Sequence, residues 1–410
     1  DLVEALSAEA AAILYNRNLQ VAQTRLFDSL IQLIAGAIDT KSPYTGGHCA
    51  RVPKLAMMIA EEAEKVDSGP LANFRFSNPD DRRAFQIGAW LHDYGKMTTP
   101  EFIVDKAVKL ETLYNRIHEI RTRFEVLIRD IRIGEKDAVL AGADSAAAAA
   151  ERERKERELA DEFAFVAQCN IGAEDMSPED MERLRKIGER KWFRSLDPGL
   201  GLSWEELDRL TASGSVRLPG WEPLLADRPE HIIPLPVKSK SAYEGCRFIL
   251  PQPDCLYNRG EIYNLSIRRG TLTEEERFKI NEHIMQTILM IEKLPLPDTL
   301  SRVPEYAGTH HETLAGTGYP RGLKRQKLSI PSRIMAVADI FEALTASDRP
   351  YKRAKTLSEA VTILHQFKRN GLIDPDVFDL FLTSGIYRLY GERYCSPGQI
   401  DDVDIGRFIG

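Results

Sequence analysis

Hydrophobic positions follow a helical period near the start of the chain. Residues 2–38 contain no proline, and no glycine before Gly36. Apolar side chains recur there every seven residues, and two neighbours widen the stripe: Leu19, Leu26 and Leu33, with Leu30 and Ile34. This spacing predicts one long helix with a single apolar seam.

Two interpretations of this helix stay open, because three heptads are few for a coiled coil. The seam either docks on the core of the same chain or pairs two copies as a signalling helix below a sensor domain. The chain begins at Asp1 instead of methionine, which favours a fragment or processed form of a longer protein.

Further helices are predicted in two flanks, where apolar residues recur at spacings of three and four. Thr273 and Glu276 form a predicted capping box, as do Thr356 and Glu359. Pro331 suits the first turn of a helix. The expected helices cover residues 48–63, 83–93, 274–291, 331–341, 356–370 and 375–383.

The character of the chain changes between residues 112 and 262. A charged helical stretch at 117–133 is followed by an alanine run and alternating charges, and prolines become frequent after Pro198. An irregular tract of this length predicts an insertion with its own secondary structure. Three tryptophans predict that it has a small packed core: Trp192, Trp204 and Trp221.

Composition limits the class of protein. With 410 residues, of which 43% are hydrophobic and 29% charged, the chain suits a globular protein with one to three cores. No apolar run approaches the roughly 18 residues needed to span a bilayer, and no signal peptide opens the chain. Five scattered cysteines without CxxC spacing favour reduced thiols and a cytoplasmic location. The net charge of −7 disfavours binding to long nucleic acid, but a local basic pocket for a small anion is compatible with it.

The adjacent pair His310 and His311, followed by a glycine-bracketed turn, is the strongest chemical signal. Consecutive helical residues point about 100° apart, so such a pair suits metal ligation better than a packing stripe. Asp339 lies on an otherwise apolar helix, and a buried carboxylate without a partner costs several kcal/mol. Histidine and carboxylate ligands match iron, manganese or zinc.

Other histidines are more ambiguous by themselves. A single buried histidine such as His283 is more often a hydrogen-bonded core residue than a ligand. We interpret His118, His231 and His365 as ordinary surface or core residues.

Five motifs, in this order, resemble those of the HD-GYP family: YTGGHCARV at 44–52, LHDYGK at 91–96, His283, HHE with GTGYP at 310–320, and DIFEALT with RPYK at 339–352. The resemblance covers about residues 30–111 and 263–385. It implies an all-α fold, an HD-type helical bundle with a long N-terminal signalling helix and a mixed, mainly helical insertion. The domains would be 1–38 for the helix, 39–111 with 263–410 for the catalytic domain, and 112–262 for the insertion.

The resemblance implies a bacterial signalling enzyme: a metal-dependent phosphodiesterase that opens cyclic di-GMP to the linear dinucleotide, and in some members to GMP, with a di-metal-activated hydroxide. His48, His92, Asp93 and Asp339 would hold one metal. Asp93 would bridge to a second metal held by three more ligands: His283, His310 and His311. The two divalent ions would be iron or manganese, with zinc, nickel and magnesium compatible.

Substrate contacts are implied as well. Lys96 would neutralise charge on the scissile phosphate, although a lysine at a helix end also suits the helix dipole. Arg349 and Lys352 would clamp the substrate phosphates. Gly318 and Tyr319 would shape the substrate pocket or a docking surface for a diguanylate cyclase of the GGDEF type, and Tyr319 equally suits a turn aromatic packed on its own helix.

Two departures from the family pattern matter. Ala315 replaces the usual aspartate of HHExxDGxGYP, and Tyr44 stands where members with a third metal carry glutamate. Because Tyr44 replaces that glutamate, we expect two metals. The resemblance implies a cyclic dinucleotide substrate, and the N-terminal helix suggests a homodimer. A preference for cyclic GMP-AMP, a catalytically weak receptor and a general HD phosphohydrolase stay as alternatives.

Overall fold

The computed structural model describes residues 2–41, 47–172, 175–214, 218–236, 243–347 and 354–409. These residues form fifteen α-helices and two small two-stranded sheets, so the predicted all-α fold is confirmed. Three residues named above lie outside the described residues: Tyr44, Arg349 and Lys352.

The chain divides into two compact units. The first consists of Asp1–Glu101, Gly245–Leu250 and Asn281–Gly410, and the second of Phe102–Glu244 and Pro251–Ile280. This division reflects contacts within the folded chain and does not show which segment is an insertion. The assignment of 112–262 as an insertion therefore stays a prediction.

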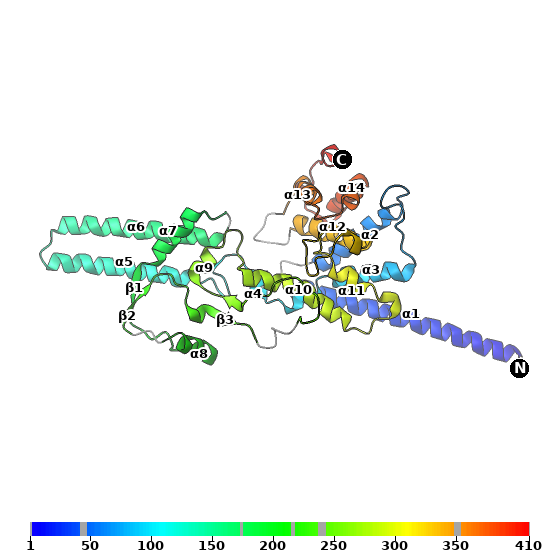
Figure 1. The fold of residues 1–410 in the computed structure, drawn as a ribbon, viewed down its shortest axis with the longest axis horizontal. Helices are drawn as coiled ribbons and strands as arrows, with labels where there is room; N and C mark the ends of the chain where they lie inside the picture. The colour runs from blue at the N-terminus through cyan, green and yellow to red at the C-terminus, as the bar shows by residue number, and fades with distance from the viewer. Residues whose placement is uncertain are drawn as a thin grey trace. The chain divides into compact units, whose positions relative to one another are not determined.

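The first unit is a helical bundle. Its elements are α1 (Leu2–Lys41), α2 (His48–Ala63), α3 (Pro79–Leu91), η1 (Tyr94–Thr98), the part of α10 (Glu274–Glu292) from Asn281 onward, η4 (Asp298–Leu300), α11 (Val303–Gly308), η5 (Arg325–Lys327), α12 (Ile330–Thr345), α13 (Leu357–Arg369), α14 (Pro375–Thr383), α15 (Ile386–Tyr394), η6 (Pro397–Gln399) and η7 (Ile405–Arg407) (Figure 1).

Local sequence explains where several of these helices begin. The Asn78 side chain accepts a hydrogen bond from the Asp81 amide at the start of α3, and Thr356 and Glu359 form the predicted capping box of α13. In the core, α2 packs against α3 and α12, and α11 packs against α3. Large side chains that are almost fully buried fill the space between the helices: Phe85, Tyr306, Phe341, Phe378, Phe381 and Tyr390.

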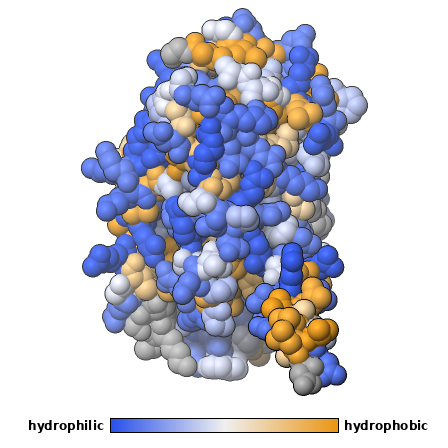
Figure 2. Space-filling view, turned by 90° about the vertical axis from the view of Figure 1, so that its right-hand side faces the viewer, coloured by the Kyte–Doolittle hydropathy of each residue, from blue (hydrophilic) through white to orange (hydrophobic). Residues whose placement is uncertain are grey.

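The predicted long N-terminal helix is confirmed as α1, but it docks through a different face from its leucine seam. Ile31, Ala35 and Ile38 are buried in the first unit. The four leucines of the seam are between 49% and 70% exposed: Leu19, Leu26, Leu30 and Leu33. The fifth seam residue, Ile34, is half-buried and packs against the core. Figure 2 shows hydrophobic surface at the free end of this helix. The leucines of the seam therefore stay uncovered in the single chain.

The second unit is built around the antiparallel pair α5 (Ile117–Leu140) and α6 (Ser145–Ile171), which lie side by side (Figure 1). The strands pair antiparallel, β1 with β2 and β3 with β4. The remaining elements are α4 (Glu101–Val104), α7 (Pro178–Gly188), β1 (Lys191–Arg194), α8 (Trp204–Ala212), β2 (Gly220–Pro223), η2 (Pro229–His231), β3 (Ile232–Pro234), β4 (Cys255–Asn258), α9 (Glu261–Leu265) and the first turns of α10.

This unit has the small core that its tryptophans predicted, but only one of the three tryptophans packs against that core. Trp192 packs against the core, whereas Trp204 and Trp221 are 74% and 63% exposed. Trp221 meets Phe193 edge to face on the β1–β2 ribbon, with ring centroids 5.3 Å apart. A two-stranded ribbon covers only one of its faces, so these rings stay at the surface.

Two findings concern the chain as a whole. None of the five cysteines, all of which lie in the described residues, forms a disulfide. Among the described helices, none combines the length and the apolar character needed to cross a membrane.

Candidate metal centre

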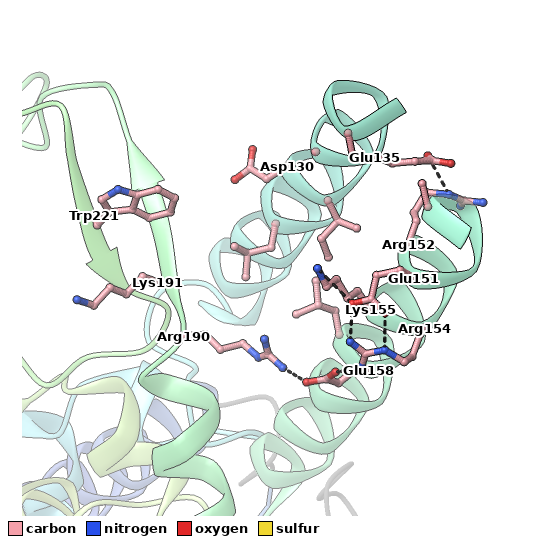
Figure 3. Close-up of a pocket in the computed structure, with 16 residues that line it drawn as sticks. Asp130, Glu135, Glu151, Arg152, Arg154, Lys155, Glu158, Arg190, Lys191 and Trp221 are labelled. Carbon is pink, nitrogen blue, oxygen red and sulfur yellow. Dashed lines mark hydrogen bonds and ion pairs between the residues drawn. The ribbon is translucent and has the colours of Figure 1, made fainter. Parts of the chain in front are cut away.

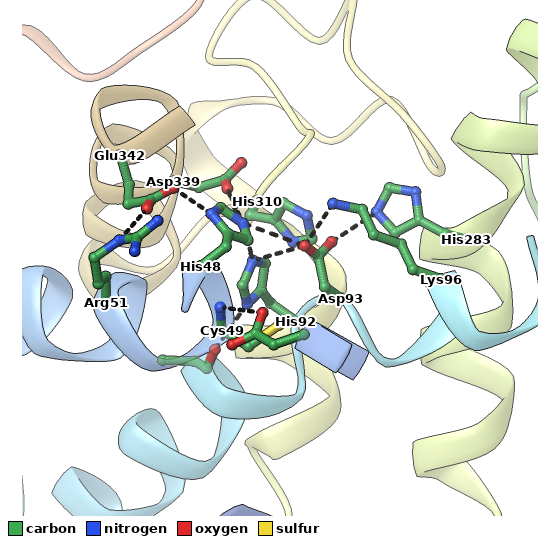
Figure 4. A network of polar contacts seen from close by, with 12 residues as sticks. His48, Cys49, Arg51, His92, Asp93, Lys96, His283, His310, Asp339 and Glu342 are labelled. Atoms are coloured by element: carbon green, nitrogen blue, oxygen red, sulfur yellow. Dashed lines mark hydrogen bonds and ion pairs between the residues drawn. The ribbon is translucent and has the colours of Figure 1, made fainter. Parts of the chain in front are cut away.

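Segments far apart in the sequence bring all seven predicted metal ligands together in the first unit. Figure 4 labels six of them, all except His311. His48 is the first residue of α2, His92 caps the end of α3, and Asp93 follows it. His283 comes from the middle of α10, Asp339 from α12, and the adjacent His310 and His311 follow α11.

The first group surrounds the imidazole of His48. Its Nε2 lies 3.2 Å from Oδ2 of Asp93 and 3.3 Å from Oδ1 of Asp339. Nε2 of His92 lies 3.4 Å from the same Asp93 oxygen and 3.3 Å from Nε2 of His48. Four donor atoms thus point into one small space.

The second group consists of three histidines. The ring centroids of His310 and His311 are 4.2 Å apart, and those of His283 and His311 are 5.1 Å apart. One ligand atom from each histidine lies within 4.8 Å of those of the other two.

Asp93 lies between the two groups. Its Oδ2 faces His48 and His92, while its Oδ1 is 3.3 Å from Nε2 of His283. One carboxylate therefore offers an oxygen to each group, as a bridging ligand would.

The orientation of the imidazoles fits metal ligation. Nδ1 of His92 is hydrogen-bonded to the carbonyl of Ala89 at 2.8 Å, and Nδ1 of His310 to that of Ala307 at 3.0 Å. These bonds direct Nε2 inward, as in metal sites where a backbone carbonyl fixes the ligand. Nε2 of His310 is buried and has no hydrogen-bond partner in the described part of the chain. A cation would satisfy this atom.

Electrostatics keeps three ligands in the required protonation state. Burial acts to raise the pKa of Asp93, but Lys96 and the neighbouring histidines hold it well below its ordinary value. Hydrogen bonds from His48 and His92 likewise outweigh burial and lower the pKa of Asp339. Burial, helped by the charge of His92, lowers the pKa of His310 to about 3. Charged carboxylates and a neutral imidazole are the forms that bind metal.

His92 itself differs. Burial lowers the pKa of this imidazole less than the charges of Asp93 and Asp339 raise it, and the result is about 9. A cation at the first group would have to displace that proton.

A close backbone contact sets His283 beside Asp93. A Cβ added at Gly95 would lie 1.8 Å from the carbonyl oxygen of His283, so only glycine fits at this contact. The Gly95 amide donates to Oγ1 of Thr287 at 2.8 Å, and that hydroxyl donates to the carbonyl of His92 at 3.2 Å. The turn after His92 is thereby fastened to α10.

Two residues beside the centre escaped the sequence reasoning. Nδ1 of His48 contacts the carboxylate of Glu342, and Nε of Arg51 donates to the same carboxylate at 2.6 Å. Glu342 is fully buried. The signal was the spacing: Glu342 follows Asp339 by three residues and Arg51 follows His48 by three, so each shares a helix face with a predicted ligand.

Lys96 lies in η1, and its amine contacts the centre. Its Nζ donates to Oδ2 of Asp93 at 2.6 Å. The charge of Asp93 outweighs burial and raises the pKa of Lys96. The geometry therefore places a fixed positive charge at the carboxylate between the two groups.

The Gly-Tyr-Pro loop packs against the second group. Tyr319 stacks on His311, with ring centroids 4.8 Å apart, and its hydroxyl donates to Asn281 at 3.2 Å. A Cβ at Gly318 would lie 2.4 Å from the His311 carbonyl. Tyr319 thus packs on a predicted metal ligand and contacts α10, and Gly318 permits a close backbone approach.

Other bonds hold this loop where the family aspartate is absent. The buried Glu312 accepts hydrogen bonds from the amides of Arg321 and Leu323, each at 2.7 Å. The amide of Ala315 donates to the carbonyl of Gly371 at 3.0 Å. The loop is thus fastened at both ends without a side chain at position 315.

Comparison with known proteins finds family models and relatives that match parts of this chain. Two family models, each described as an HD domain, match residues 45–187 and 222–377. A 3'3'-cGAMP-specific phosphodiesterase of Vibrio cholerae is 39% identical over 115 residues, which are 28% of this chain and 26% of the relative. A cyclic di-GMP phosphodiesterase of Pseudomonas aeruginosa is 36% identical over 119 residues, 29% of this chain and 28% of the relative.

A longer match is the cyclic di-GMP phosphodiesterase response regulator of Xanthomonas campestris, which is 30% identical over 185 residues. It covers 43% of this chain and 47% of that relative. The chain thus spans between about a quarter and a half of the length of these relatives. HD domains depend on metal, and the two ligand groups suit that requirement. With its ordered motifs, its helical fold and these relatives, the chain belongs to the HD-GYP family of HD-domain proteins.

Proposed function

We propose that this chain hydrolyses a phosphodiester bond of a cyclic dinucleotide at a centre of two divalent metal ions. The observation that carries the proposal is the position of Asp93, whose two oxygens face different groups of histidines. The printed names of the relatives, cyclic di-GMP and 3'3'-cGAMP phosphodiesterases, support the substrate class.

In this proposal His48, His92, Asp93 and Asp339 hold one ion, with iron or manganese favoured by the mixed donors. Asp93 and three histidines hold the other: His283, His310 and His311. When bound, two such ions acidify a water and polarise the phosphoryl group. The Nζ of Lys96, 2.6 Å from Asp93, supplies positive charge where the scissile phosphate would approach.

Further substrate contacts belong to the same proposal. Arg349 and Lys352 would bind the substrate phosphates, because a guanidinium matches phosphate oxygens in pairs. Gly318 and Tyr319 would border the pocket beside His311.

The experiment compares turnover of cyclic di-GMP by protein loaded with Fe(II) or Mn(II). Asp93→Asn and His310→Ala should reduce hydrolysis to background, because each removes a donor from a shared centre. His118→Ala is the matched control, since this histidine is exposed on α5. Full activity in either ligand variant would contradict the assigned centre. Tight binding of the dinucleotide without turnover by the wild type would make the chain a receptor.

The choice between cyclic di-GMP and cyclic GMP-AMP is a finer proposal. The metal centre contacts phosphate, so it does not distinguish the bases. A relative specific for 3'3'-cGAMP favours testing both substrates. The ratio of their kcat/KM values decides which one the enzyme prefers.

We also propose that the uncovered leucine seam of α1 pairs with the same seam of a second copy. Seven-residue spacing and exposure along one face suit a helix pair. The double variant Leu19→Glu with Leu26→Glu should shift the protein toward monomer in analytical ultracentrifugation. Leu389→Glu, at an exposed leucine of α15, is the control. An unchanged dimer in the double variant would show that the dimer interface lies outside this seam.

Docking of a GGDEF cyclase at the Gly-Tyr-Pro loop would use only the exposed part of that loop. Ala315 and Thr317 are exposed there, whereas Gly318 is buried and Tyr319 packs on His311. A docking partner would therefore contact the loop through its outer turn.

A further inference from the structure

The second unit contains a cavity of about 340 Å³ whose wall is rich in arginine. Residues from α5, β1, α8 and η2, and the residues that precede α9, line it. Six half-buried arginines take part: Arg116, Arg123, Arg194, Arg209, Arg228 and Arg259. Four glutamates also line the cavity, so its wall carries excess positive charge in a chain of net charge −7.

Three of these arginines are paired with carboxylates. Arg123 makes a two-pronged contact with Glu261, with N to O distances of 2.8 and 2.9 Å. Arg194 and Arg228 share Oε2 of Glu222, at 2.9 and 2.7 Å. These contacts place a carboxylate beside each of the three guanidinium groups.

The other three have no carboxylate within 4 Å among the described residues. Nη1 of Arg116 donates to the carbonyl of Arg259 at 2.6 Å and its Nε to that of Leu110 at 3.3 Å, so its hydrogen-bond partners are neutral oxygens and not carboxylates. Nε of Arg209 is buried without a hydrogen-bond partner. The guanidinium of Arg259 makes no hydrogen bond in the described part of the chain.

The charges of these arginines act on one another. Burial, together with the neighbouring charge of Arg209, lowers the pKa of Arg259 below its ordinary value. Burial also lowers the pKa of Arg116, where the charges of Glu261 and Glu119 act against the lowering and the smaller effect of Arg259 adds to it. The charge of Glu206 partly offsets those of Arg209 and Arg259, and its carboxylate also accepts hydrogen bonds from Ser203 at the start of α8. An anion in the cavity would relieve this repulsion.

A larger cavity in the same unit lacks this property. It measures about 750 Å³ and lies between the α5–α6 pair and the β1–β2 ribbon (Figure 3). Its arginines all have carboxylate partners: Arg152 with Glu135, Arg154 with Glu151, and Arg190 with Glu158. The guanidinium groups of this cavity are thus matched by carboxylates, unlike those of Arg209 and Arg259.

We propose that the arginine cavity of the second unit binds a small phosphate-bearing ligand, either inorganic phosphate or a phosphate monoester of mononucleotide size. Guanidinium forks match phosphate oxygens in pairs, and a cavity of this volume is within the range that encloses small ligands. This site goes beyond the proposed phosphodiesterase, because it shares no residue with the metal centre.

The test is isothermal titration calorimetry of the full chain with inorganic phosphate and with GMP. Each probe should bind saturably, and Arg209→Gln and Arg259→Gln should each weaken binding at least about tenfold, since a charge-assisted contact is lost. Arg129→Gln, an exposed arginine of α5 outside the cavity, is the matched control and should bind as the wild type does. Binding of phosphate but not GMP would assign the free ion, and tighter binding of GMP would assign the ester.

Binding at the metal centre gives the opposite pattern. Affinity that is lost in Asp93→Asn and kept in Arg259→Gln would overturn the proposal, as would no saturable binding by the wild type. If the glutamine variants fail to fold, hydrogen exchange of the wild type decides. Phosphate should slow exchange in α8, and unchanged exchange there would equally overturn the proposal. Activity toward cyclic dinucleotides is measured separately, so failure of one proposal leaves the other distinguishable.

Discussion

At the scale of single residues, the first ligand group depends on a carboxylate that faces away from the other ligands. Glu342 contacts Nδ1 of His48 and is held in turn by Arg51. A carboxylate behind an imidazole fixes its tautomer and its orientation. Glu342 is therefore a positioning residue in the proposed enzyme.

Glu342→Gln should lower metal affinity by about 10- to 100-fold, because the amide keeps the shape but loses the charge behind His48. The measurement is bound metal per chain against free metal concentration, together with kcat. Glu392→Gln, on α15, is a control with a half-exposed side chain. Wild-type metal affinity in Glu342→Gln would show that His48 is oriented without this carboxylate.

At the scale of elements, the contact between η1 and α10 decides how the two ligand groups meet. Gly95 touches the backbone of α10 where a Cβ would collide with the carbonyl of His283. A backbone atom cannot move aside as the end of a flexible side chain can. The spacing between Asp93 and His283 is thus set by the absence of one side chain.

Gly95→Ala should destabilise the first unit by about 1–3 kcal/mol and reduce activity, because α10 must shift away from Asp93. Urea unfolding and turnover measure the two effects. Gly36→Ala is the control, since a Cβ there meets no atom within 4 Å and should favour α1. Equal stability of Gly95→Ala and wild type would mean that α10 can move at no cost.

At the scale of the whole molecule, the second unit should lose stability in acid through one buried ion pair. Glu261 is buried in the second unit beside Arg123. Burial acts to raise its pKa, but Arg123 and the amide of Ala226 outweigh burial and hold the pKa below the ordinary 4.5. The ion pair therefore stabilises this unit fully above about pH 4.5, and the contribution is lost as pH falls through the lower, folded pKa.

Tryptophan fluorescence during acid titration can follow this loss. Three of the four tryptophans lie in the second unit, and Trp90→Phe removes the one in the first. In that background the transition should begin below pH 4.5, and Glu261→Gln should weaken its pH dependence. An acid transition that is unchanged by Glu261→Gln would assign it to other carboxylates.

The sequence by itself predicted most helices and, through its resemblance to the HD-GYP family, the proposed ligand set. Helix starts follow from local chemistry, as the caps at Asn78 and Thr356 show, because a cap involves only residues three apart. The adjacent histidines and the buried Asp339 were recognisable because their residue types are costly in a core without a partner. The order of the five motifs then indicated the family.

Only the tertiary structure decided which groups meet. The sharing of Asp93 between two histidine groups, the support of His48 by Glu342 and the docking face of α1 depend on contacts between distant segments. His231, expected to be an ordinary residue, lines the arginine cavity, and the six arginines of that cavity show no pattern along the chain. Periodicity shows which face of a helix is apolar, but packing decides which partner covers it.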